Sequence, residues 1–141
     1  LHYSSRRQRQ MCIRDSYGSA PHTDFGCITI LAQDDVGGLQ VQSPTGEWVN
    51  VPKLKNSFVV NVGDMLHIMT NGILRSTPHR VINETGLERF SCPFFYDPNV
   101  SLDVTPLKGT GKPKFATVNF GNFLKKELGD SYKKHKASRK P

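Results

Sequence analysis

A chain of 141 residues with 36% apolar and 22% charged residues is long enough for one domain with a hydrophobic core and too short for a two-domain enzyme. Its apolar runs are strand-sized, which excludes a transmembrane helix, and its three widely spaced cysteines form no CxxC pair, which excludes a disulfide scaffold and a cysteine zinc site. This cysteine usage favours a reducing compartment, so we expect a cytoplasmic protein.

The 19 basic residues against 12 acidic ones give a net charge of +7, which first suggests nucleic acid or an anionic membrane as a partner. The charge lies at the ends, however. Residues 1–16 contain four arginines and one aspartate, and residues 125–141 contain seven basic and two acidic side chains. Residues 17–124 contain eight basic and nine acidic side chains. Charge runs at chain ends are usually solvated tails, so we expect neither a nucleic-acid nor a membrane partner.

These ends also set the predicted domain boundaries. Residues 4–16 show neither helical nor strand periodicity and resemble translated vector sequence, so we interpret 1–16 as a non-native segment. Residues 17–124 then form the one domain, and residues 125–141 form a basic C-terminal tail.

Between the ends, short β-branched and apolar runs alternate with turn signals. Residues 39–42 alternate polar and apolar side chains, and residues 43–46 carry Pro and Gly where a type I turn prefers them. A hairpin of 39–42 with 48–51 is therefore predicted. Strands spaced by roughly 8–12 residues are typical of an antiparallel sandwich or barrel. The predicted strands are residues 27–31, 39–42, 48–51, 58–62, 79–82 and 90–96.

The other segments are less regular. Residues 65–69 form a short apolar segment of undetermined type, and residues 108–114 form a loop. Apolar residues at helical spacing predict a helix over Phe120–Leu128. Local spacing alone would pair the strands 79–82 and 90–96 as a hairpin.

Two histidines and one aspartate supply the ligand types of a metal site. His22 and Asp24 are two residues apart, so in an extended segment both side chains face the same side. His79 follows Pro78 at the start of a later strand. Two imidazoles and one carboxylate with open positions form the facial triad of non-haem Fe(II) oxygenases. The ordinary alternative is a surface histidine that happens to lie beside an aspartate.

A second polar pair follows ten residues after His79. Arg89 and Ser91 are again two residues apart, and a guanidinium and a hydroxyl that point together can clamp a carboxylate. Without the histidines and the aspartate, a solvent-facing strand arginine would be the favoured interpretation.

Several segments resemble the 2-oxoglutarate- and Fe(II)-dependent dioxygenases of the isopenicillin N synthase-like class. They match in order from about Gly18 to Tyr96, with weaker similarity to about Tyr132. The segments are His-Thr-Asp-Phe-Gly (22–26), Leu-Ala-Gln-Asp-Asp-Val-Gly-Gly-Leu-Gln-Val (31–41), Val-Asn-Val-Gly-Asp-Met-Leu (60–66), Thr-Asn-Gly (70–72), Arg-Ser-Thr-Pro-His-Arg-Val (75–81) and Arg-Phe-Ser-Cys-Pro-Phe-Phe (89–95).

The resemblance implies a site and a reaction. His22, Asp24 and His79 would be the catalytic Fe(II) ligands, and Arg89 and Ser91 would bind the distal carboxylate of 2-oxoglutarate. Dioxygen and 2-oxoglutarate would be the co-substrates. The implied reaction is the oxidation of a small organic substrate, hydroxylation being favoured, with release of succinate and carbon dioxide.

The resemblance also implies a fold: an all-β core with a C-terminal helix, arranged as a double-stranded β-helix or jelly roll. It places the strands 79–82 and 90–96 in opposite sheets, against the hairpin that local spacing favours. Family members have a helical N-terminal half, which this chain lacks. We therefore expect the catalytic part of a longer enzyme, with apolar surface exposed and a substrate pocket that includes Ile28, Ile30, Met69 and Phe95.

Three alternatives stay open at this point. An oxidase of the isopenicillin N synthase type would use the iron without 2-oxoglutarate, because its Arg-x-Ser pair binds a substrate carboxylate. A fragment could bind metal and catalyse nothing. A nucleic-acid binder would rest on the basic ends alone. The substrate and the oligomeric state stay open in all three.

Overall fold

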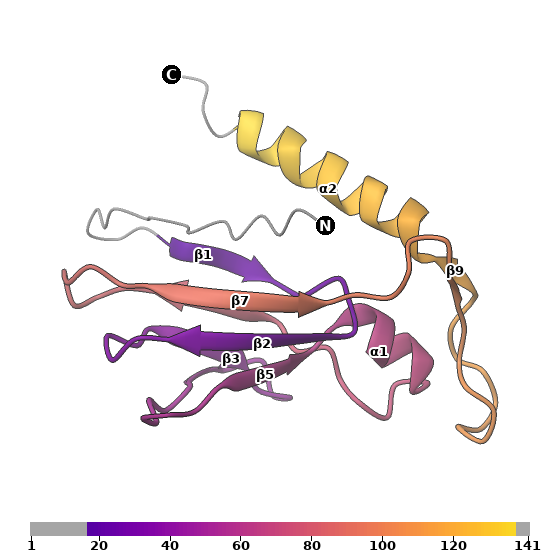
Figure 1. The fold of residues 1–141 in the computed structure, drawn as a ribbon, viewed down its shortest axis with the longest axis horizontal. Coiled ribbons are helices and arrows are strands. Elements are labelled where there is room, and N and C mark those ends of the chain that lie inside the picture. Colours follow the sequence, from indigo (N-terminus) through magenta and orange to yellow (C-terminus); the bar gives the residue numbers. More distant parts are fainter. Residues whose placement is uncertain (1–16, 138–141) are drawn as a thin grey trace.

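The computed structural model describes residues 17–137, and the predicted non-native segment 1–16 lies outside them. The described part is built mainly from short strands, with one short and one long helix (Figure 1). In chain order the elements are β1 (Tyr17–His22), β2 (Ile28–Gln33), β3 (Leu39–Gln42), β4 (Trp48–Asn50), β5 (Val59–Val62), α1 (Asp64–Met69), β6 (His79–Ile82), β7 (Ser91–Tyr96), β8 (Asp103–Val104), β9 (Val118–Asn119) and α2 (Phe120–Ala137).

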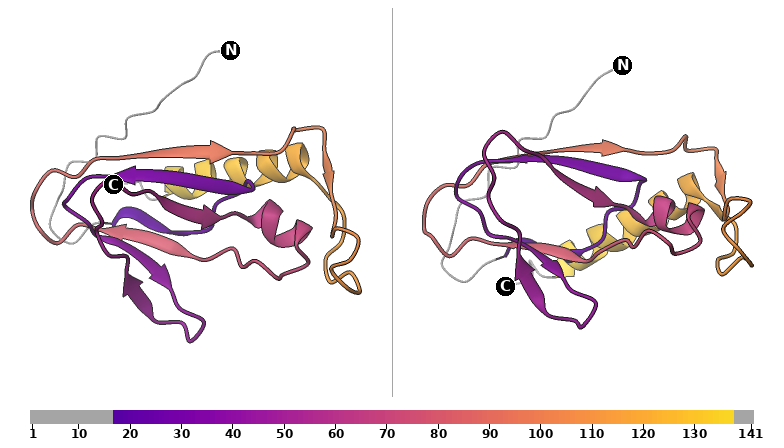
Figure 2. Two further views of the ribbon diagram at one scale, coloured as in Figure 1. Left: turned by 60° about the horizontal axis from the view of Figure 1, so that its bottom comes forward. Right: turned by 90° about the horizontal axis from the view of Figure 1, so that it is seen from below.

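Two antiparallel sheets form the body of the molecule. The first has the strand order β1-β6-β3-β4, and the second has the order β5-β2-β7. Figure 2 shows the turn of the β3–β4 hairpin pointing away from the other strands, while β3 itself pairs with β6. Because β6 and β7 lie in different sheets, the local-spacing expectation of a hairpin between them is wrong, and the arrangement implied by the resemblance is found.

The predicted strands agree with the structure within a few residues, but three strands were not predicted, namely β1 and the two-residue strands β8 and β9. β1 was not predicted, because Tyr17–His22 contains Gly, Ser, Ala and Pro and shows no apolar alternation; its ladder with β6 holds it extended. The undetermined segment 65–69 lies in the helix α1, which ends at Met69 and is followed by Asn71 and Gly72, both with positive φ. The residues Asn71 and Gly72 thus marked the end of this segment in the sequence, although the sequence did not show that the segment is a helix.

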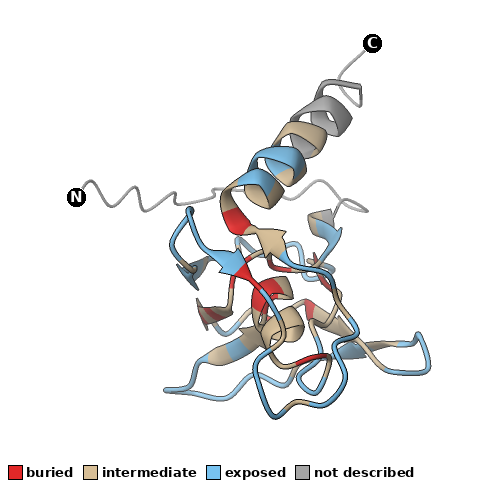
Figure 3. Ribbon diagram, turned by 90° about the vertical axis from the view of Figure 1, so that its right-hand side faces the viewer, coloured by how far each residue is buried: buried red, intermediate tan, exposed pale blue. Residues whose placement is uncertain are grey.

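Two separate clusters of buried side chains form the core. Leu31 of β2 packs with Leu39 and Val81 of the other sheet, so this cluster joins the two sheets. Met65 of α1 packs with Val104 and Phe120; the buried positions in Figure 3 gather around α1 and the start of α2. Since burial of apolar area drives packing, this second cluster fixes α1 against the C-terminal segment.

The β5-β2-β7 sheet leaves its outer face exposed. Strand alternation places Thr29 and Leu31 toward the other sheet and Ile28 and Ile30 on the opposite face. Side chains that pair with these isoleucines across the strands share the outer face, and three of them are substantially exposed: Val60 (60%), Phe94 (45%) and Tyr96 (59%). The expected exposed apolar surface is therefore present on this face.

The expected pocket residues separate accordingly. Ile28 and Ile30 lie on the outer face of the β5-β2-β7 sheet. Met69 packs against the buried cluster of Met65, Val104 and Phe120. Phe95 pairs with Thr29 and shares its inward face, and it is 53% exposed. That these four residues line a substrate pocket stays a prediction.

The C-terminal helix is longer than predicted. α2 begins at Phe120, as expected, and continues to Ala137, so it takes in much of the segment 125–141 that was expected as a basic tail. Its first turn is fixed by Phe120 in the core and by Phe123, whose ring meets Phe25 edge-on at 6.0 Å. Among the described residues, neither helix is long and apolar enough to cross a membrane.

Candidate metal centre

The ladder between β1 and β6 brings two histidines together. His22 is the last residue of β1 and His79 is the first of β6, and the two are directly paired across the strands. Their ring centroids are 4.3 Å apart. Antiparallel pairing puts paired side chains on the same face, so the register alone places both imidazoles at one point.

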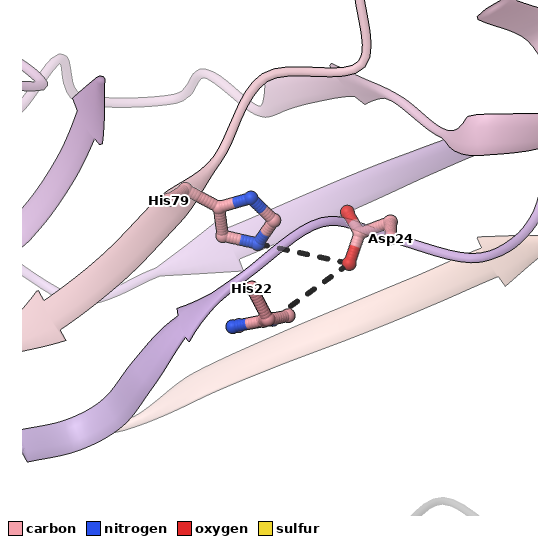
Figure 4. Close-up of side chains that lie close together, drawn as sticks. All are labelled: His22, Asp24 and His79. Carbon is pink, nitrogen blue, oxygen red and sulfur yellow. Dashed lines mark ion pairs between the residues drawn. The ribbon is translucent and has the colours of Figure 1, made fainter. Parts of the chain in front are cut away.

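Asp24 completes the cluster from the loop that follows β1. Its Oδ1 lies 3.6 Å from Nε2 of His79 and 3.9 Å from Nε2 of His22 (Figure 4). The candidate ligand atoms of the three side chains all lie within 4.8 Å of one another. Asp24 and His79 are buried, whereas the side chain of His22 is 42% exposed, so the cluster is open to solvent on the His22 side.

Each imidazole is oriented by a hydrogen bond between its Nδ1 and a backbone carbonyl. Nδ1 of His22 lies 2.7 Å from the carbonyl of Ala20, and Nδ1 of His79 lies 3.2 Å from the carbonyl of Thr77. A carbonyl only accepts, so each Nδ1 donates a proton, and each Nε2 is the ring atom that could bind a metal. Histidines that bind metals are held in this way by a second hydrogen bond. Both Nε2 atoms face Asp24.

The electrostatics of the cluster fit a cation. Oδ2 of Asp24 is buried without a hydrogen-bond partner, a costly state for a carboxylate. Burial lowers the pKa of His79, as does the neighbouring His22, and Asp24 offsets only part of this. The His79 ring thus stays neutral, which is the form that binds metal, to lower pH than an ordinary histidine. Two imidazoles and one carboxylate suit Fe(II).

Arg89 and Ser91 also meet as predicted. Nη1 of Arg89 donates to the Ser91 hydroxyl at 3.0 Å, and Nε donates to the carbonyl of Gly37 at 2.6 Å. Nη2 approaches Oε1 of Gln33 at 3.4 Å. Burial lowers the pKa of Arg89, and Asp34 partly offsets this, but a guanidinium stays charged in proteins. The structure therefore holds a partly buried cation and a hydroxyl side by side.

Two carboxylates near these groups were missed from the sequence. Asp34 accepts the backbone N–H of Phe90 and fixes the segment that carries Arg89. Asp64 accepts hydroxyl hydrogen bonds from Thr23 and Ser76, which lie beside the histidines and Asp24. Asp64 lies after Gly63 at the end of a strand and within the segment 60–66 that carries the family resemblance, but neither signal predicted its contacts.

His67 is not part of the cluster. Its Nδ1 donates to the carbonyl of Leu74 at 2.7 Å, and its ring meets Phe115 edge-on at 5.0 Å. We expect His67→Ala to leave metal affinity unchanged and to cost about 1 kcal/mol of stability from the lost hydrogen bond. Calorimetric titration with Mn(II) and thermal unfolding measure the two effects. Loss of metal binding in this variant would show that the wrong histidine was chosen.

Comparison with known proteins finds relatives named as iron- or 2-oxoglutarate-dependent enzymes. The model of the 2OG-Fe(II) oxygenase superfamily matches residues 2–98. A Dictyostelium discoideum protein named "probable iron/ascorbate oxidoreductase" is 53% identical over 94 residues, which are 66% of this chain and 26% of that protein. The 2-oxoglutarate-dependent dioxygenase citB of Monascus ruber is 44% identical over 113 residues, 79% of this chain and 34% of that protein.

The fold of the chain is similar to solved structures of proteins crystallised with alpha-KG. A full-length Neurospora crassa protein, crystallised in complex with alpha-KG and thymine, superposes with a TM-score of 0.76 at 35% identity, covering 82% of this chain and 38% of that one. The expected double-stranded β-helix, an all-β core with a C-terminal helix, is confirmed. The chain spans between about a quarter and two fifths of the length of the proteins compared.

Proposed function

The chain belongs to the 2OG-Fe(II) oxygenase superfamily, and from this premise we propose that it supplies the catalytic part of an Fe(II)- and 2-oxoglutarate-dependent oxygenase. The observation that carries the proposal is the cluster of His22, Asp24 and His79, with both Nε2 atoms and a buried carboxylate facing one point. We propose residues 17–124 as the catalytic domain. Its substrate is a small organic molecule, and its reaction is hydroxylation.

The three ligand side chains have distinct parts in this proposal. Nε2 of His22, Nε2 of His79 and the carboxylate of Asp24 would hold Fe(II), which supplies dioxygen activation when it is bound. The carboxylate lowers the net charge of the site by one unit, and its unpartnered Oδ2 is available to the metal. The exposed side of His22 leaves an approach for the co-substrates.

Arg89 and Ser91 would bind the distal carboxylate of 2-oxoglutarate. Together they present a charged and a neutral donor, which is the arrangement that favours a carboxylate. Gly37 and Gln33 already orient the guanidinium, so little side-chain freedom is lost on binding. A co-substrate fixed at one end presents its other end in one orientation, which is the positioning effect that raises reaction rates.

The overall reaction balances as follows. Dioxygen gives one oxygen atom to the substrate C–H bond, which becomes C–OH, and the other to the carboxylate of succinate; the 1-carboxylate of 2-oxoglutarate leaves as carbon dioxide. The substrate class is supported by the structurally similar Neurospora crassa protein, which was crystallised with thymine and alpha-KG, the latter being 2-oxoglutarate. A heterocycle of that size is a suitable first substrate to test.

The test measures succinate formed by the full chain with Fe(II), 2-oxoglutarate, dioxygen and a panel of small heterocycles and organic acids. Omission of Fe(II), omission of 2-oxoglutarate and addition of a chelator are the controls. Succinate that depends on both Fe(II) and 2-oxoglutarate supports the proposal. Substrate oxidation without 2-oxoglutarate would replace it by an iron oxidase. Metal binding with no turnover under any condition would contradict a catalytic function for this chain.

A further inference from the structure

We propose that Asp64 is a positioning residue that holds the Asp24 loop and the segment leading to His79 in the arrangement needed for metal binding. The inference rests on the proposed function, because it concerns the residues that would hold Fe(II). Among the described residues, Asp64 hydrogen-bonds through its carboxylate to Thr23 and Ser76 rather than to the three ligand side chains. It is the first residue of α1, and its two carboxylate oxygens each accept a hydrogen bond from a different segment of the site.

The two hydrogen bonds come from the two chain segments that carry the candidate ligands. Oδ2 of Asp64 accepts the hydroxyl of Thr23, which lies between His22 and Asp24, at 3.2 Å. Oδ1 accepts the hydroxyl of Ser76 at 2.5 Å. Ser76 begins the segment Ser76-Thr77-Pro78 that enters β6 at His79, and Thr77 supplies the carbonyl that orients the His79 ring. One carboxylate thus joins both ligand-bearing segments.

Asp24 depends on such support more than the histidines do. His22 and His79 are paired in a β-ladder, which fixes their positions. Asp24 lies beyond the end of β1 and has no ladder partner, and its Oδ2 makes no hydrogen bond. Its backbone is held instead by the start of α1, because the N–H of Asp64 donates to the carbonyl of Asp24 at 2.8 Å.

Neighbouring backbone contacts show that the start of α1 is docked on the Asp24 loop. The N–H of Met65 donates to Gly26, and the N–H of Gly63 donates to Cys27. A Cβ at Gly63 would collide with the carbonyl oxygen of Gly26, so a larger residue there would push the two segments apart. The backbone brings Asp64 within reach, and its side chain then ties in the second segment through Ser76.

An acidic residue in the first turn of a helix has an ordinary explanation, which is favourable interaction with the helix dipole. The contacts of Asp64 go further than that explanation requires. α1 has only six residues, and because its N-cap residue is Gly63, no side chain caps the start of the helix. Both oxygens of Asp64 are used by hydroxyls from other segments. A dipole effect would change stability alone, whereas a positioning effect changes metal affinity.

The experiment compares Mn(II) affinity and metal-free stability in the full chain. Asp64→Ala removes both acceptors, and we expect a loss of about 10- to 100-fold in Mn(II) affinity, the range seen when a partner of a metal ligand is removed. Asp64→Asn keeps an acceptor oxygen, so it should recover part of this loss. Asp103→Asn is the matched control, since Asp103 accepts a single hydrogen bond from Asn119 and should bind Mn(II) like the unsubstituted chain.

Ser76→Ala tests whether Asp64 acts through its hydrogen bond to Ser76. It also provides a second test of the inference if Asp64→Ala fails to fold. We expect Ser76→Ala to weaken Mn(II) binding by less than Asp64→Ala, and the double variant to lose no more than Asp64→Ala alone, because both changes remove the same contact. Additive losses would overturn the assigned route. Co(II) absorption at saturation gives a spectroscopic check, since a displaced carboxylate alters the ligand field and a destabilised but intact site does not.

The outcomes separate this inference from the proposed function. If the unsubstituted chain binds neither Mn(II) nor Fe(II), the proposed function fails. If it binds metal and Asp64→Ala binds Mn(II) within twofold of it, with a lower unfolding temperature only, Asp64 is structural and the positioning inference fails while the proposed function stands. Weaker Mn(II) binding at an unchanged metal-free unfolding temperature supports the inference directly.

Discussion

Asp24→Ala is expected to abolish Fe(II)-dependent succinate formation and to weaken metal binding by more than about 100-fold, since even a partner outside the ligand set is worth about 10- to 100-fold. Asp24 is the only carboxylate among the three candidate ligands that the structure brings together. Its removal takes away one ligand and the negative charge that offsets the cation. Calorimetric titration with Mn(II) and a succinate assay measure the two losses.

The same substitution should not destabilise the metal-free chain. Oδ2 of Asp24 is buried without a hydrogen bond, and an unsatisfied buried carboxylate costs about 1–3 kcal/mol or more. The metal-free variant should therefore unfold at a temperature equal to or above that of the unsubstituted chain, and only the rise caused by added Mn(II) should disappear. Asp103→Ala is the control. Retained Fe(II)-dependent activity in Asp24→Ala would refute the ligand assignment.

Arg89→Ala is expected to raise the concentration of 2-oxoglutarate required for half-maximal succinate formation by about 10- to 100-fold, since hydrogen bonds to charged groups contribute about 1.5–3 kcal/mol. Mn(II) affinity should stay within twofold of the unsubstituted value, because Arg89 bonds to Ser91, Gly37 and Gln33 and to none of the three ligands. Titration of 2-oxoglutarate at saturating Fe(II) gives the first value.

Two further variants make the Arg89 result specific. Arg89→Lys keeps the charge and loses the planar fork, so it should fall between the unsubstituted chain and Arg89→Ala. Arg75→Ala removes an exposed arginine elsewhere and should change neither value. An unchanged 2-oxoglutarate requirement in Arg89→Ala would count against the clamp and favour an oxidase that works without this co-substrate.

The sequence predicted the elements whose local signals agree with their tertiary setting. Residues 39–42 alternate and pack one face against the core, and the predicted hairpin with the next strand is found. β1 could not be predicted, because its extended form comes from the ladder with β6 and not from its own residues. The pairing of β6 and β7 was predicted wrongly from spacing, since strands close in sequence enter different sheets here.

The residues of the candidate site also fall into those that the sequence indicated and those that it did not. His22 and Asp24 could be predicted because two residues in one short segment carry the signal. His79, Arg89 and Ser91 were singled out by residue type and position, and the family resemblance then assigned all five residues their roles. Asp64 could not be predicted, since its meaning comes from hydroxyls that lie far along the chain on both sides of it. Polar networks between distant segments leave no periodic pattern, and only the folded arrangement shows them.

The ladder between β1 and β6 also determines when the cluster can form. It joins the first described strand to one just past the middle of the chain, with β2 to β5 and α1 between them. Closing so long a loop costs entropy before its contacts stabilise the chain, so such pairings form late in folding. Until they form, His22 and Asp24 are separated from His79, and no partly folded chain holds the three ligands together. Metal would then bind only after β1 and β6 have paired, and once bound it would slow unfolding that starts with the release of β1.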